Sequence, residues 1–155
     1  MADGGIESGF QFDSYKIDKI DFSVEQNINT LHSKIDEYEP EYSFGFRDAF
    51  RYKNIADKVI YVTGLEIRVT IKSRADQHDM ATGRFITTGL FYGVGKLSEK
   101  QEEMLAKVQG PAILFPYARS IVSQTLYNAG FAVPVMPLIN VNELAKKMNV
   151  KIIDR

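Results

Sequence analysis

A change in the spacing of apolar residues divides the chain and most constrains its fold. Before residue 95 apolar residues recur at every second position, most clearly within 58–72, where they are Val59, Tyr61, Leu65, Ile67, Val69 and Ile71. This is the period of a β-strand with one buried face. From Ser98 onward the spacing and the end signals become helical. Strands followed by helices are typical of an α+β fold, so we expect a four-stranded antiparallel sheet with helices packed on one face.

The four strands are predicted at 9–26, 42–52, 58–72 and 85–94, with a turn over 73–79. In the first strand the alternation changes phase twice, which predicts bulges or bends. In the second strand the aromatic residues share one parity, which predicts one strongly aromatic face: Tyr42, Phe44, Phe46, Phe50 and Tyr52. The connectivity is that of a meander or a Greek key.

Two helices are predicted in the middle of the second half. Ser98 and Gln101 form a capping-box pattern that begins a helix of about eleven residues, and Gly110 is expected to end it. A longer helix is predicted from Pro111 to Gly130.

An apolar segment and a last helix follow. Residues 131–139 contain two prolines and no polar side chain, so they cannot form an ordinary helix. Asn140 and Glu143 begin a short helix that reaches about Met148. Because an irregular segment tends to lie at the surface, the apolar loop is expected to mark a partner or ligand groove.

Composition excludes several classes of protein. The 155 residues are 45% apolar and 25% charged, which indicates one globular domain, expected at 10–148 between a flexible leader (1–9) and a short basic tail (149–155). The chain has no cysteine, which fits a cytoplasmic location and excludes thiolate chemistry. No apolar run approaches the ~18 residues of a membrane span. The net charge is −1 and no basic cluster indicates nucleic-acid binding.

The sequence lacks the residue patterns that are typical of common catalytic and metal-binding sites. His32 and His78 are the only histidines, and neither has a second ligand at metal-binding spacing. The run from Gly89 to Lys96 resembles a phosphate-binding loop, but leucine replaces the required glycine at 90 and the required serine or threonine at 97. We therefore expect no metal, no cofactor and no enzymatic activity.

Several motifs resemble the SecB family of protein-export chaperones over about residues 10–148. They are GPAILFPYAR at Gly110–Arg119, Gly130-Phe131, PLINVNEL at Pro137–Leu144 and, less specifically, Gly89–Tyr92 and Ile20–Glu25. The resemblance implies an ATP-independent holdase that binds unfolded or nascent polypeptides for export. It also implies a homotetramer built as a dimer of dimers.

The resemblance also implies a client-binding groove and a docking site for the motor SecA. The groove residues would be Tyr42, Phe44, Phe46, Phe50, Phe131, Val133, Val135, Met136 and Leu138. SecA docks on acidic residues in the family, and Asp21 and Glu25 match two of them. Arg84 replaces a third acid and the C-terminal stretch is basic, so SecA binding is expected to be weaker.

Three functions remain open from the sequence. The first is a general holdase that serves export. The second is a SecB-like chaperone dedicated to one client, such as the antitoxin of a toxin–antitoxin pair. The third is a domain that binds a small apolar ligand, which Arg119 would orient from within an apolar helix.

Overall fold

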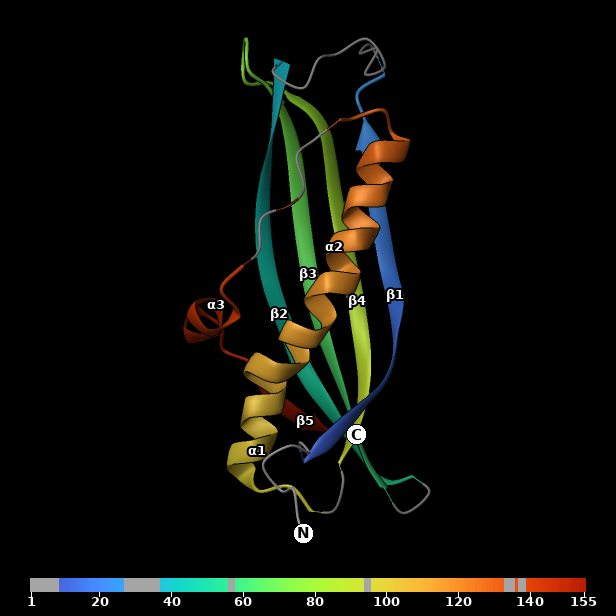
Figure 1. Ribbon diagram of the computed structural model, residues 1–155, viewed down its shortest axis with the longest axis vertical. Helices are drawn as coiled ribbons and strands as arrows, with labels where there is room; N and C mark the ends of the chain where they lie inside the picture. Colours follow the sequence, from blue (N-terminus) through green and yellow to red (C-terminus); the bar gives the residue numbers. More distant parts are fainter. Residues whose placement is uncertain (1–8, 27–36, 56–57, 94–95, 133–135, 137–138) are drawn as a thin grey trace.

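The molecule is a single five-stranded sheet with helices on one face (Figure 1). It is described by a computed structural model over residues 9–26, 37–55, 58–93, 96–132, 136 and 139–155. The strands are β1 (Phe10–Val24), β2 (Tyr38–Ile55), β3 (Lys58–Ser73), β4 (Asp79–Gly93) and β5 (Ile152–Asp154). The predicted α+β fold is confirmed, and the short strand β5 is additional to the four predicted strands.

The strand order β1-β4-β3-β2-β5 resolves the connectivity. Strands β2, β3 and β4 follow one another as antiparallel neighbours, and β1 lies antiparallel beside β4. This is a Greek-key arrangement rather than a simple meander. The two phase changes predicted in the first strand are confirmed as register shifts, between Phe12 and Ser14 and between Ile17 and Lys19.

One continuous helical run replaces the two helices predicted around Gly110. It consists of α1 (Glu99–Met104), a π-helical segment η3 (Leu105–Gln109) and α2 (Gly110–Asn128). The prediction that Gly110 ends a helix is wrong, because its dihedral angles are helical (φ −60°, ψ −56°) and its N–H donates to the carbonyl of Leu105. The next residue is Pro111, which has no N–H, and the wider π turn carries the chain past this missing donor.

Gly110 allows the helical run to lie close to the sheet. A Cβ atom at this position would come within 2.8 Å of the Leu105 carbonyl oxygen and 2.9 Å of the Thr63 hydroxyl on β3. A glycine is therefore required here for close approach and not for a turn. A turn does require Gly130, whose φ of 93° ends α2 as the sequence predicts.

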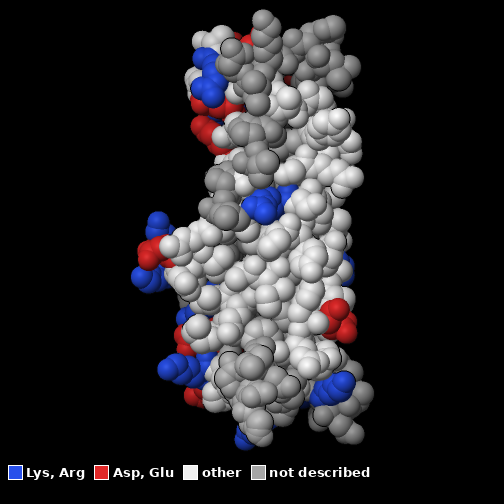
Figure 2. All heavy atoms as spheres, viewed as in Figure 1, with Lys and Arg blue, Asp and Glu red and all other residues white. Residues whose placement is uncertain are grey.

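The main core lies between α2 and the sheet. Its fully buried members include Leu65, Ile67, Phe85, Leu114 and Val122. Seen from the α2 side, the central part of the molecule carries few charged residues (Figure 2). The predicted caps are confirmed: Ser98 and Gln101 bond to each other at the start of α1, and Asn140 caps α3 (Val141–Lys147). The aromatic residues Tyr42, Phe44 and Phe46 of β2 pack at the edge of the main core.

Candidate functional site

Three aromatic side chains line the helix-covered face of β2. Tyr42, Phe44 and Phe46 pair in register with Val69, Ile67 and Leu65, which are buried beneath α2. We call these three residues the β2 aromatic strip. They are half-buried and pack against the main core. The strip therefore keeps part of its aromatic surface open while the core fixes its position.

The strip is fixed by contacts from the helix and by burial. The ring of Phe44 meets the ring of Phe115 on α2 edge-on, with centroids 5.9 Å apart and planes at 67°. Burial raises the pKa of the Tyr42 hydroxyl above its usual value, so this side chain stays neutral at physiological pH. The strip is thus an uncharged aromatic surface of fixed geometry.

The expectation of one aromatic face along the whole of β2 is wrong. A register shift between Arg47 and Phe50 turns the strand, so Phe50 pairs with Val62 on the face away from α2. The guanidinium of Arg155 lies over the Phe50 ring, 4.5 Å from its centre. Ala49 takes the helix-side position and is buried. The structure therefore separates Phe50 from the β2 aromatic strip.

The apolar segment after α2 is partly a core element. Phe131 and Met136 are each only 1% exposed and belong to the main core. The Phe131 ring packs edge-on against Tyr38, with centroids 5.3 Å apart, and the N–H of Ala132 donates to the Tyr38 hydroxyl at 2.7 Å. These contacts tie the segment to the beginning of β2. The other predicted groove residues, Val133, Val135 and Leu138, lie outside the described residues.

The residue at the expected SecA-docking position, Arg84, is held in an ion pair. Its guanidinium donates to the carboxylate of Glu66 at 2.8 and 2.7 Å. Arg68 binds the same carboxylate at 2.8 Å, and Arg47 lies 3.7 Å from it. Glu66 lies between the buried Leu65 and Ile67, so this cluster faces away from α2. Three arginines thus surround one carboxylate, and Asp21 on β1 is in register with Arg84.

Burial and hydrogen bonds act in opposite directions on Glu66. Burial raises its pKa, but the hydrogen bonds from Arg84 and Arg68 outweigh burial and hold the pKa below its usual value. The spacing of residues in the sequence does not identify Glu66 as the partner of Arg84. Its position among the polar, even-numbered residues of β3 indicates only that Glu66 lies on the polar face of that strand. The pairing of β3 with β4 brings Glu66 and Arg84 together.

The two acids expected at the docking site lie apart from each other along β1. Asp21 is in register with Arg84, whereas Glu25 lies just beyond the end of β1. The Glu25 carboxylate is 3.0 Å from Nε2 of His78. A hydrogen bond with Asp76 and the charges of Asp76 and Glu25 raise the pKa of His78. His78 is thus an ion-pair partner of two acids.

Further features bear on the other functions considered. The guanidinium of Arg119 lies 5.8 Å from the ring centre of Phe115, one turn earlier on α2. Within the described ranges, no group of acids and histidines could hold a metal ion. No described helix is long and apolar enough to cross a membrane.

Comparisons with known proteins agree on one family. The family model described as "Preprotein translocase subunit SecB" matches residues 9–150. The protein-export protein SecB of Dichelobacter nodosus is 30% identical over 105 residues, which cover 68% of this chain and 65% of that relative. The protein-export protein SecB of Erythrobacter litoralis is 28% identical over 83 residues, covering 54% of this chain and 46% of the relative. The chain thus spans between about half and two thirds of the length of these curated relatives.

A solved structure has the same fold. It is the Mycobacterium tuberculosis SecB-like chaperone Rv1957 in complex with a ChAD peptide from the Rv1956 HigA1 antitoxin, with a TM-score of 0.63 and 17% identity. The similarity covers 84% of this chain and 91% of that one. The family and its relatives are described by a role in protein export, which confirms the expectation that the chain is not an enzyme. Because the family model matches well over half of the chain, this protein belongs to the SecB family.

Proposed function

We propose that this protein is an ATP-independent holdase chaperone of the cytoplasm that binds unfolded or nascent polypeptides. The observation that carries the proposal is the β2 aromatic strip, Tyr42, Phe44 and Phe46, which is half-buried, uncharged and held in place by the core. Membership of the SecB family supports the proposal. The absence of cysteine supports the location, since a reducing compartment suits such a chain.

The chemistry of the strip suits clients of varied sequence. Hydrophobic contact is non-directional and depends mainly on the apolar area removed from water. Aromatic rings offer a large area at low entropic cost, and pairs of rings add about 0.5–1.5 kcal/mol beyond burial. Several such weak contacts along one unfolded chain add up through effective concentration. A short aromatic strip is therefore enough to delay aggregation without specific recognition.

A homotetramer, as a dimer of dimers, is the proposed assembly. Tyr15, Ile17 and Ile20 on β1 are 42–46% exposed, which is unusual for side chains on the helix-covered face of a sheet. β1 is an edge strand, so this apolar surface is accessible to a second subunit. Light scattering of the purified protein measures the mass; four chains are expected, and a monomer at micromolar concentration would contradict this part of the proposal.

Suppression of aggregation tests the function directly. A chemically unfolded, unrelated client is diluted into buffer with increasing amounts of the chaperone, and light scattering reports aggregation. We expect suppression near stoichiometry. In the double variant Tyr42→Thr, Phe44→Thr, threonine keeps the strand propensity while the aromatic area is lost. The concentration needed for half-suppression should rise about tenfold, the equivalent of ~1.4 kcal/mol.

The matched control removes an aromatic ring elsewhere. Tyr127 on α2 is 77% exposed, and Tyr127→Thr should leave suppression unchanged. Circular dichroism and thermal melting must show that each variant is folded. Equal activity of the folded double variant and wild type would contradict the assignment of the strip.

A chaperone dedicated to one client is the second candidate. The cluster of Arg47, Arg68 and Arg84 around Glu66 favours it, because Arg84 replaces an acid of the family's SecA-docking surface. The structural neighbour Rv1957 binds a peptide from an antitoxin. A tetramer that protects none of several unrelated clients would favour this candidate over the general holdase.

A further inference from the structure

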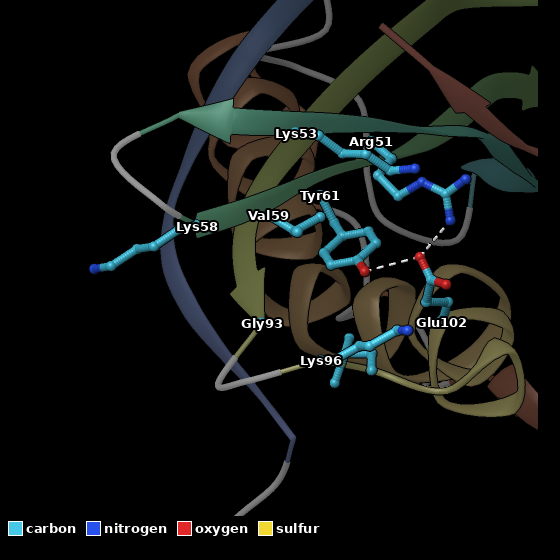
Figure 3. A pocket seen from close by; sticks show the side chains of 9 residues that line it. Arg51, Lys53, Lys58, Val59, Tyr61, Gly93, Lys96 and Glu102 are labelled. Carbon is cyan, nitrogen blue, oxygen red and sulfur yellow. Dashed lines mark hydrogen bonds and ion pairs between the residues drawn. The ribbon is translucent and has the colours of Figure 1, made fainter.

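A hollow of about 380 Å³ lies where the end of β2, the start of β3 and the end of β4 meet α1 (Figure 3). We call it the basic pocket. Its lining residues are Arg51, Lys53, Lys58, Val59, Tyr61, Gly93, Lys96, Leu97 and Glu102. Four of these are cations and one is an acid. The pocket lies outside the β2 aromatic strip, and the proposed function does not use it.

Among the described residues, the four cations of the basic pocket outnumber the two acids beside it, Glu102 and Asp154. Arg51 binds Glu102 at 2.6 Å and also donates twice to Asp154, at 2.7 and 2.8 Å. Both acids are therefore engaged by a single arginine. Lys53 is 3.9 Å from Asp154, at the limit of an ion pair. Among the described residues, Lys58 and Lys96 have no carboxylate within 4.0 Å.

The side chains around Glu102 point into a common space. Figure 3 shows the nitrogens of Lys53 and Lys96 directed to the side of the pocket where Arg51 meets the Glu102 carboxylate. Lys58 points the other way, and its ammonium lies over the ring of Tyr92, 4.5 Å from the centre. Three cations from two segments, β2 and the connection between β4 and α1, thus converge on one space, and a fourth lies at its rim.

Arg51 is held rigidly and still has donors to offer. One N–H from each of its three nitrogens is used by Glu102 and Asp154. A guanidinium has five N–H donors, so two remain. The Tyr61 hydroxyl donates to the same Glu102 oxygen at 2.8 Å and fixes that carboxylate. Two N–H groups of Arg51 are therefore left as donors, while its positive charge is already matched by the two acids.

We propose that the basic pocket binds a di- or triphosphate group. The converging ammonium groups of Lys53 and Lys96 and the free donors of Arg51 suit an anion with several negatively charged oxygens. The hollow is larger than a single phosphate requires, and its cations are spread around it. Lys96 ends the Gly89–Lys96 run, which fails as a phosphate-binding loop in its spacing but places its lysine in this pocket. The proposal concerns binding alone and is independent of chaperone activity.

Isothermal titration calorimetry with inorganic triphosphate tests the proposal, at constant ionic strength on the full chain. We expect saturable binding, and at least tenfold weaker binding of orthophosphate. The double variant Lys53→Gln, Lys96→Gln should bind triphosphate at least tenfold more weakly. The control Lys146→Gln, Lys147→Gln removes the same two charges from α3, whose lysines are exposed, and should change the affinity less than twofold.

Titrations with two further ligands distinguish the sources of the bound anion. The proposal is supported if adenosine triphosphate binds at least as tightly as inorganic triphosphate. If it binds more tightly, the nucleoside also contacts the pocket. Hexaglutamate binding more tightly than triphosphate would overturn it in favour of an acidic protein segment. Absence of saturable triphosphate binding, or equal loss of affinity in the α3 control, would also overturn it.

Discussion

Replacing Gly110 with alanine tests the contact that sets the helical run against the sheet. In an ordinary helix interior, Gly→Ala stabilises by about 1 kcal/mol, because alanine loses less backbone entropy. Here the new Cβ would lie 2.8 Å from a backbone carbonyl and 2.9 Å from the buried Thr63 hydroxyl. Overpacking of this kind costs about 1–3 kcal/mol, and a backbone oxygen cannot turn aside. With a cost near the upper end, we expect a net loss of about 1–2 kcal/mol.

Urea unfolding monitored by circular dichroism measures this loss, at one protein concentration because assembly contributes to stability. The melting temperature should fall by about 3–6 °C for a chain of this size. Gly45→Ala is the matched control, since no atom lies within 4 Å of a Cβ at that strand position. It should be neutral or slightly stabilising.

A double variant identifies the atoms responsible. The Thr63 hydroxyl has no hydrogen-bond partner among the described residues, so Thr63→Ala removes the obstacle without breaking a hydrogen bond. Gly110→Ala should therefore cost at least 0.5 kcal/mol less in the Thr63→Ala background. A Gly110→Ala protein at least as stable as wild type would refute the reasoning, because helix propensity would then outweigh the close contact.

Four further predictions concern charge, hydrogen bonding and the end of α2. The folded-state pKa of Glu66 lies below its usual 4.5, so its stabilising effect is present above pH 4.5 and is lost as the pH falls through the folded-state value. Glu66→Gln should therefore reduce the fall in unfolding free energy between neutral and acidic pH. An unchanged fall would contradict this. Arg84→Glu should strengthen SecA binding at low salt but not at high salt, because salt screens the added charge. Biolayer interferometry on folded protein measures the affinity, and no gain at low salt would count against docking at this position. Tyr61→Phe should lower the free energy of unfolding by about 1 kcal/mol through loss of the bond to Glu102, and a neutral result in urea unfolding would argue against that bond. Gly130→Ala should cost about 1 kcal/mol in the same assay because of its positive φ, and a gain in stability would be inconsistent with that conformation.

The sequence alone determined the features that arise from local periodicity and local hydrogen bonding. Alternation predicted the four long strands, and its two phase changes predicted the bulges of β1. The caps at Ser98 and Asn140 and the stop at Gly130 depend only on residues a few positions apart, which is why their types reveal them. The motifs also predicted the SecB family, since Gly110–Arg119 and its neighbours lie close together in the sequence.

Tertiary structure alone decided the features that depend on partners distant in sequence. The alternation in β2 placed Phe50 with Phe44, but a bulge reversed its face, and alternation within one strand does not reveal where a partner strand shifts register. Gly110 carries the signal of a helix end, yet it lies inside a helical run at a point where β3 leaves no room for a Cβ atom. The pairing of Arg84 with Glu66 depends on strands meeting across the sheet. The basic pocket likewise joins residues from β2, β3, β4 and α1, and only folding brings these segments together.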